Sequence, residues 1–186
     1  MSRLHDLYSE QGQSPWLDNL KRNWIVSGEL QGWVDRGARG ITSNPSIFQK
    51  AMTGTDAYDE QLRSLTAEGA SVEESYWKLV VRDIMDALEI LRPVHESSNG
   101  LDGYVSVEVD PRLATDTGGT IAAARELHER IDRPNLYVKI PATAEGIPAI
   151  HRMISEGRSI NVTLIFSLDR YREVMEAYVS GLESCP

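Results

Sequence analysis

Short segments rich in apolar residues recur along the chain. In several of these segments apolar and polar residues alternate, and the pattern predicts β-strands. They cover residues 14–18, 40–44, 104–110, 136–140 and 160–166. Between them, apolar residues recur at the three- and four-residue spacing of amphipathic helices. The predicted helices cover residues 28–36, about 58–69, 76–93, 120–131, 145–155 and the segment after Ser167. This alternation of strands and helices predicts an α/β fold with a parallel sheet.

Residues suited to helix ends mark several of these boundaries. Gly37 and Gly157 follow helical segments as stop signals, and Pro93 is expected to end the helix before it. Ser167 is a suitable N-cap for the last helix, and Asp169 lies in its first turn. We expect this last helix to direct five residues toward the core, namely Leu168, Tyr171, Val174, Tyr178 and Leu182.

The predicted strands each divide into an apolar and a polar set, because successive strand side chains face opposite sides. In 136–140, Leu136, Val138 and Ile140 oppose Tyr137 and Lys139. The same division holds in 104–110, where three valines oppose Tyr104, Ser106, Glu108 and Asp110. Four of the strands therefore present one apolar side and one side with polar groups.

Two architectures fit strand–helix alternation, an open doubly wound sheet and a closed barrel. Strands covered by helices on both faces are apolar throughout, which these are not. A TIM (β/α)8 barrel covers only the outer face and holds its chemistry at the carboxyl end of the strands. We therefore predict a single partial barrel domain over residues 1–186, with about the first five of the eight β/α units.

The polar strand residues are expected to converge on one site. They are Asn44, Glu108, Lys139, Asn161 and Thr163, with Asp18 added from the first strand. The lysine has two interpretations. It forms a buried ion pair, or it is an amine that attacks a carbonyl, because burial lowers the pKa of a lysine and so favours its neutral, nucleophilic form. Polar groups from several strands favour a site, since buried ion pairs contribute little net stability.

Some of these residues also have structural interpretations. Asp18 precedes a polar helical segment and is suited to capping it, while Asn44 before Pro45 is suited to starting a turn. Asn161 and Thr163 are suited to filling a barrel interior. These alternatives stay open on the sequence alone.

Composition narrows the range of partners. The 186 residues include 28 acidic and 19 basic ones, for a net charge of -9, which disfavours nucleic acid and anionic membranes. The single cysteine, Cys185, and four scattered histidines offer no disulfide and no metal-binding spacing. No signal peptide or membrane-spanning run is apparent, so we expect a cytoplasmic protein.

Five stretches resemble the transaldolase family, specifically its longer bacterial branch. They are 16–18 (WLD), 40–48 (GITSNPSIF), 106–113 (SVEVDPRL), 137–143 (YVKIPAT) and 161–167 (NVTLIFS). They follow one another in order along almost the whole chain, and together they are highly specific. The resemblance implies a transferase that moves a dihydroxyacetone unit between sugar phosphates in the non-oxidative pentose phosphate pathway. Its donors would be ketose phosphates such as sedoheptulose 7-phosphate or fructose 6-phosphate.

The resemblance also implies a role for each candidate. Lys139 would form a Schiff base with the ketose C2 carbonyl, and Asp18 would take the proton of the C4 hydroxyl. Glu108 and Thr163 would hold the water that shuttles protons. Two asparagines and a threonine would bind the dihydroxyacetone end, namely Asn44, Asn161 and Thr42. No metal and no cofactor is implied.

The family pattern extends past this chain. Its sixth strand and the following loop supply a serine and a phosphate-binding arginine, so we expect the 186-residue chain to be poorly active alone. The resemblance leaves open a homo-oligomer and a C-terminal isomerase domain in a longer parent. Two other functions compete: a fructose-6-phosphate aldolase-type lyase, which Glu108 disfavours, and a non-catalytic barrel fragment.

Overall fold

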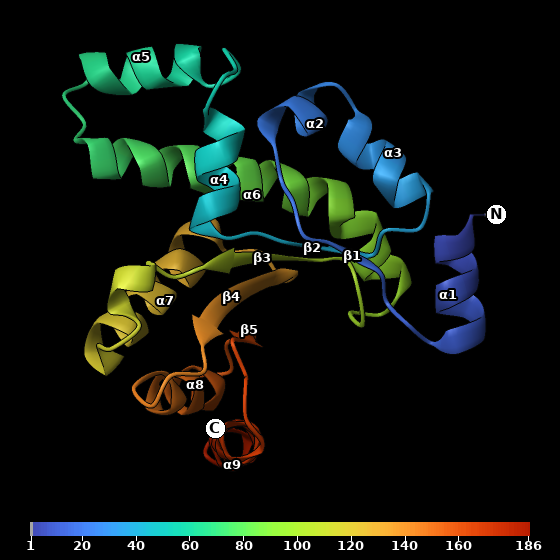
Figure 1. Cartoon of the computed structure of the whole chain (residues 1–186), viewed down its shortest axis with the longest axis vertical. Coiled ribbons are helices and arrows are strands. Elements are labelled where there is room, and N and C mark those ends of the chain that lie inside the picture. Colours follow the sequence, from blue (N-terminus) through green and yellow to red (C-terminus); the bar gives the residue numbers. More distant parts are fainter. Residues whose placement is uncertain (1) are drawn as a thin grey trace. The chain divides into compact units, whose positions relative to one another are not determined.

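The computed structural model describes residues 2–186 and shows an α/β fold with one parallel sheet. The strands follow the order β1-β2-β3-β4-β5, which is also their order in the sequence (Figure 1). They are β1 (Trp16–Leu17), β2 (Gly40–Thr42), β3 (Tyr104–Glu108), β4 (Leu136–Pro141) and β5 (Ile160–Thr163). Because helical sequence follows every strand, the arrangement confirms the predicted fold class of the first five β/α units of a barrel.

The chain forms two compact units, one reaching to Val105 and the other spanning Ser106–Pro186. The first contains α1 (Arg3–Gln11), α2 (Arg22–Val26), α3 (Glu29–Asp35), α4 (Pro45–Met52), α5 (Asp59–Ala67) and α6 (Val72–Ser97). The second contains the short 3-10 helix η1 (Pro111–Leu113), α7 (Thr117–Ile131), α8 (Gly146–Ser155) and α9 (Leu168–Glu183). That residues 1–186 form a single domain stays a prediction. Within residues 2–186, no helix is both long and apolar enough to cross a membrane.

Helices α1 and α4 were not expected from the sequence, and α2 was expected only as the polar helical segment after Asp18. The helix α4 begins at Pro45, where a proline costs no hydrogen bond, and Asn44 caps it. The helix α2 has only five residues, too few for a periodic pattern to appear.

A buried polar cluster fixes α2 against α6 in the first unit. Arg22 donates from Nε to Asp83 Oδ1 (2.7 Å), and the Tyr58 hydroxyl donates to Asp83 Oδ2 (2.8 Å). The Arg22 guanidinium also lies over the Tyr58 ring, 4.3 Å from its centroid. Burial raises the pKa of Asp83, and the hydrogen bond and charge of Arg22 oppose that shift. The Asp83 carboxylate accepts two hydrogen bonds, and these offset the free-energy cost of removing it from water.

The helix α6 continues past Pro93, contrary to the expectation that it ends there. A proline in a helix removes one N–H bond, here to the carbonyl of Glu89, and strains the preceding turn. Two hydroxyls bond to carbonyls of the last turn: Ser97 Oγ donates to Val94 O (3.2 Å), and Ser98 Oγ to His95 O (3.0 Å). The helix therefore ends only at Ser97, four residues after the expected end.

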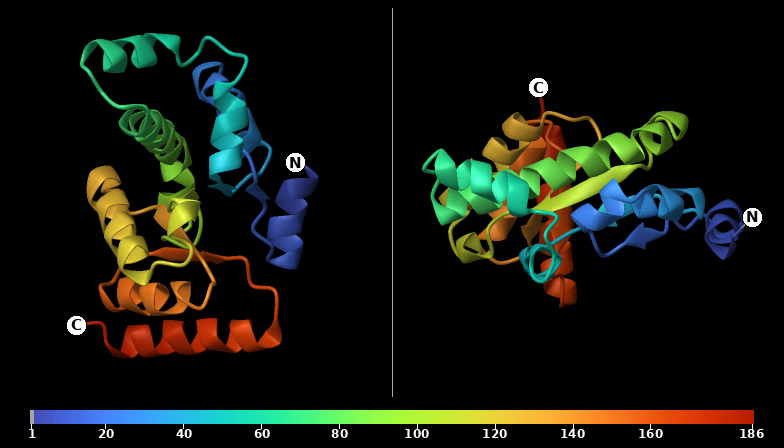
Figure 2. Two further views of the ribbon diagram at one scale, coloured as in Figure 1. Left: turned by 60° about the vertical axis from the view of Figure 1, so that its left-hand side comes forward. Right: turned by 90° about the horizontal axis from the view of Figure 1, so that it is seen from above.

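The second unit is built on β4, whose apolar set is fully buried. Leu136, Val138 and Ile140 are almost inaccessible to solvent, as the alternation predicts. The helices α8 and α9 pack side by side (Figure 2). Ile150 and Met153 of α8 are completely buried, so this helix contributes much of the core of the unit.

The helix α9 presents a different face to the core than expected. Val174 is buried as predicted, but Leu168 is 74% exposed, and Tyr171, Tyr178 and Leu182 are each 50% exposed. The other buried positions of α9 are Ala177 and Gly181, which were not predicted. A Cβ at Gly181 would lie 2.9 Å from Ile154 of α8, so small residues are needed where the two helices meet.

The strand β5 is shorter than expected, because 164–166 lie outside it. Leu164 has a φ of 62°, in the left-handed region that an extended strand does not use. The first two strands are also shorter than predicted, and Asp18 and Asn44 follow them rather than belonging to them.

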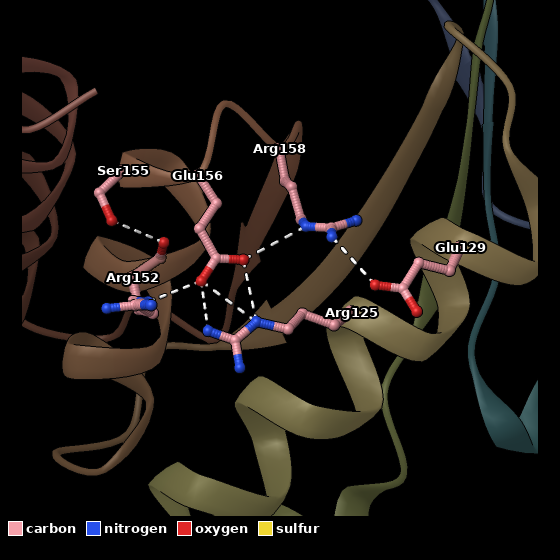
Figure 3. A network of polar contacts seen from close by, with 6 residues as sticks. All are labelled: Arg125, Glu129, Arg152, Ser155, Glu156 and Arg158. Atoms are coloured by element: carbon pink, nitrogen blue, oxygen red, sulfur yellow. Dashed lines mark hydrogen bonds and ion pairs between the residues drawn. The ribbon is translucent and has the colours of Figure 1, made fainter. Parts of the chain in front are cut away.

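Charged side chains connect α7, α8 and the turn after α8 (Figure 3). Glu156 accepts from Arg125 Nε (2.9 Å), Arg152 Nε (2.6 Å) and Arg158 Nε (3.4 Å). Arg158 Nη2 also donates to Glu129 (3.2 Å). Hydrogen bonding from Arg125 is the main cause that lowers the pKa of Glu156 to about 2, with Arg152 adding to it.

Candidate active site

Lys139 lies in the middle of β4 on the side opposite the apolar set, and it is 7% exposed. Its Nζ lies 3.2 Å from Oε2 of Glu108, the last residue of β3. The Val109 amide donates to the Lys139 carbonyl (3.1 Å), which joins the end of β3 to β4 at this level. The amine and the carboxylate are therefore held as a largely buried pair.

Asn161 and Thr163 lie on the neighbouring strand. Asn161 is the register partner of Lys139, so their side chains lie on the same face of the sheet. Thr163 follows two residues later on that face, and its carbonyl accepts from the Ala142 amide (2.8 Å). The second unit thus brings four of the predicted residues together, namely Glu108, Lys139, Asn161 and Thr163.

Ser106 is a member of this group that was not selected from the sequence. Its hydroxyl accepts from Nδ2 of Asn161 (3.0 Å), and its side chain is completely buried. It belongs to the polar set of β3, two residues before Glu108, and that shared face was the available signal. A small hydroxyl in a strand is common, which is why the pattern did not single it out.

The remaining predicted residues lie in the first unit, each at or just after the end of a strand. Asp18 follows β1 in an exposed bend, and Thr42 is the last residue of β2. Asn44 caps α4, because its Oδ1 accepts from the Ile47 amide (2.9 Å). That these three approach Lys139 stays a prediction.

The structure tests the structural interpretations of two of these residues. Asp18 does not cap α2, because the N-cap position of that helix is Lys21. Asn44 does have a structural role, since it caps α4. The cap uses Oδ1, and an asparagine amide also has two N–H donors on Nδ2, so capping is compatible with ligand contact.

The strand exit beside Glu108 is fixed by a local ion pair. Arg112 donates through Nε to both carboxylate oxygens of Asp110, at 3.0 and 2.9 Å. These hydrogen bonds are the main reason that the pKa of Asp110 lies below its ordinary value. The Asp110 carboxyl therefore stays ionised, and Arg112 balances its charge at the turn that follows β3.

The Lys139–Glu108 pair can support carbonyl chemistry. A lysine that gives up its proton becomes a nucleophile, and a carboxylate within hydrogen-bond range can move protons during attack and loss of water. Among residues 2–186, no cluster of three or more histidine, cysteine, aspartate or glutamate side chains is arranged to hold a metal ion. Fold and site together define an α/β protein with a buried lysine–carboxylate pair on adjacent strands.

Comparison with known proteins shows the family. Residues 15–184 match the family described as transaldolase/fructose-6-phosphate aldolase. The transaldolase of Saccharopolyspora erythraea is 54% identical over 176 residues, which are 94% of this chain and 48% of that protein. The transaldolase of Thermobifida fusca is 53% identical with the same coverage. That of Parafrankia sp. is 51% identical over 181 residues, 97% of this chain and 49% of that protein.

This chain belongs to the transaldolase/fructose-6-phosphate aldolase family. It spans about half the length of the curated relatives it matches.

Proposed function

We propose that the protein containing this chain is a transaldolase that forms a Schiff base at Lys139. The observation that supports this most is the position of the Lys139 amine, buried on β4 and 3.2 Å from the Glu108 carboxylate. Burying a lysine costs free energy even when it is paired, so a buried lysine–carboxylate pair on one face of a sheet is a candidate functional site, and membership of this family supplies a reaction for it.

In the proposed reaction, the Lys139 amine attacks C2 of a ketose phosphate, and loss of water gives an iminium. Asp18 removes the proton of the C4 hydroxyl, and the C3–C4 bond breaks as an aldose phosphate leaves. The iminium accepts the electron pair, so the retained three-carbon unit is an enamine. This enamine then attacks the carbonyl carbon of a second aldose phosphate, and hydrolysis frees the lysine.

Glu108 and Thr163 are proposed to act on the water of this cycle. Glu108 is already within hydrogen-bond range of the amine, so it can exchange the protons that attack and hydrolysis require. Thr163 follows Asn161 on the same face of β5 and offers a hydroxyl to the same water.

Three residues are proposed to hold the hydroxyls of the dihydroxyacetone unit, namely Asn44, Asn161 and Thr42. Amides and hydroxyls suit this task because a sugar hydroxyl both donates and accepts. Holding the enamine in place favours attack on the acceptor over early protonation by water.

The proposal includes sugar phosphate substrates such as sedoheptulose 7-phosphate or fructose 6-phosphate, a place in the non-oxidative pentose phosphate pathway, and the cytoplasm. It requires no metal and no other cofactor, because the lysine itself supplies the electron sink. We further propose that the 186-residue chain turns over slowly alone, since the serine and arginine implied by the family pattern lie outside its sequence.

Borohydride trapping tests the proposal on the chain as it is. Incubation with fructose 6-phosphate and borohydride should reduce the iminium and leave one sugar-derived adduct on Lys139, located by peptide mass spectrometry. Lys139→Met should remove the adduct, while Lys78→Met, at an exposed site of α6, should not change it. A wild-type chain that gains no adduct at Lys139 would contradict the proposal.

The family description also covers fructose-6-phosphate aldolase, which releases the three-carbon unit instead of transferring it. Assays with and without an added acceptor separate the two. A transferase forms product from fructose 6-phosphate only when an acceptor aldose phosphate is added, whereas a lyase releases dihydroxyacetone without one.

A further inference from the structure

We infer that Ser106 is a positioning residue of the proposed site, which fixes the side-chain amide of Asn161 so that Oδ1 faces the ligand hydroxyl. The inference rests on the proposed function. Its starting point is the hydrogen bond that Asn161 Nδ2 donates to Ser106 Oγ (3.0 Å). Ser106 is completely buried, so bulk water does not compete for this contact.

The bond joins two strands that are not neighbours. Ser106 lies on β3 and Asn161 on β5, and the strand of Lys139 lies between them. Strands two positions apart in a sheet are separated by about 9.5 Å, and only a concave face brings short side chains at that separation into contact. The bond therefore passes across the face that holds Lys139.

The register places this bond at the level of the reacting amine. Asn161 is the register partner of Lys139, and Ser106 is two residues from Glu108 on the same face of β3. A movement of the Asn161 amide would therefore change the contacts of a ligand joined to Lys139.

An asparagine amide has two different ends, one with an acceptor oxygen and one with two N–H donors. When Nδ2 donates to Ser106, Oδ1 is the end left to accept from a hydroxyl of the three-carbon unit. Without the serine hydroxyl, rotation of the amide by 180° exchanges these ends at little cost. Loss of Ser106 should then weaken binding of hydroxylated ketones without affecting the lysine.

The test compares borohydride trapping of dihydroxyacetone and acetone on the 186-residue chain. Acetone has the carbonyl but no hydroxyl for Asn161 to bind. In Ser106→Ala, we expect the half-saturating concentration of dihydroxyacetone to rise about five- to tenfold, as loss of one hydrogen bond predicts. The value for acetone should stay within about twofold of wild type.

A second variant and a double variant separate positioning from packing. Ser106→Cys keeps the size of the side chain but accepts weakly, so it should resemble Ser106→Ala. In an Asn161→Ala background, adding Ser106→Ala should cause no further loss. Circular dichroism and the thermal midpoint show whether each variant folds.

The outcomes are distinguishable. If wild type labels at Lys139 but both Ser106 variants bind dihydroxyacetone normally, the inference is wrong and the proposed function stands. Equal losses for dihydroxyacetone and acetone would also overturn it, because they would indicate a general packing defect. If wild type does not label Lys139 with any ketone, the proposed function fails and the inference fails with it.

Discussion

The carboxylate of Glu108 lies close enough to the Lys139 amine to exchange protons with it, and nearly out of contact with solvent. An ion pair in such a place has little net effect on stability, because desolvation offsets the attraction between the charges. We therefore expect the ion pair to affect the rate of a reaction at Lys139 and not the free energy of unfolding.

Glu108→Gln tests this expectation. The amide keeps the size of the side chain but does not take up a proton, so the rate of trapping of dihydroxyacetone at Lys139 should fall by about 100-fold or more. Adduct should still accumulate at Lys139 on long incubation, since the lysine is intact. The matched control is Glu129→Gln, at an exposed ion pair on α7, which should label at the wild-type rate. An unchanged rate in Glu108→Gln would rule out the proton-transfer role.

Among the helices, the contact of α8 with α9 depends on residue size. Two effects compete at Gly181, because alanine is the better helix former by about 1 kcal/mol but its Cβ would lie 2.9 Å from Ile154. Overpacking of a close contact costs about 1–3 kcal/mol, so the steric effect is expected to win.

We therefore expect Gly181→Ala to lower the free energy of unfolding measured in urea. Gly32→Ala is the matched control, because Gly32 is also helical and has no atom within 4 Å of an added Cβ. That variant should be as stable as wild type or up to about 1 kcal/mol more stable. A stabilising Gly181→Ala would show that α9 can move away from α8 at no cost.

The arginines around Glu156 make the stability of this helix layer depend on pH. The folded-state pKa of Glu156 is about 2, below its ordinary value of 4.5. The unfolded chain therefore binds the proton more tightly, so the contribution is fully present above about pH 4.5 and is lost as the pH falls toward 2. In urea titrations, Glu156→Gln should be less stable than wild type at pH 7, and the difference should shrink between pH 4.5 and 3. Glu126→Gln, at an exposed pair with Arg130, should show neither effect.

At the scale of the whole molecule, apolar side chains are exposed around the end of β5 and along α9. Phe166 is 87% exposed, and Leu168, Tyr171, Tyr178, Val179 and Leu182 are each at least half exposed. Among residues 2–186, β5 pairs with β4 and has no strand on its other side. A free strand edge beside exposed apolar groups favours association.

We expect the 186-residue chain to self-associate with rising concentration in sedimentation velocity experiments. The double variant Phe166→Glu with Leu168→Glu should shift the population toward monomer, because it places charge on this surface. Val72→Glu is the control, since Val72 is 89% exposed but lies at the start of α6 in the other unit. A monomeric wild type at every concentration would contradict the prediction.

Strong local patterns were read correctly from the sequence. The alternation in β4 placed Leu136 and Ile140 inside and Lys139 on the other face, and the structure confirms it. The Ser167 cap of α9 was also recognised, because its hydroxyl accepts from the Arg170 amide as the motif requires. The predictions failed at Pro93, past which α6 continues, and in α9, where the small residues Ala177 and Gly181 are buried and most of the large apolar ones are not.

The sequence by itself determined the α/β class, the polar face of the strands, and the place of Lys139 on that face. These features follow from periodicity and residue type, which are local properties of the chain. Only the tertiary structure decided the contacts that these residues make: the Glu108 carboxylate 3.2 Å from the Lys139 amine, and the Ser106–Asn161 bond across its strand. The reason is physical, since side chains on different strands meet through register and sheet curvature, and neither is encoded in any one segment.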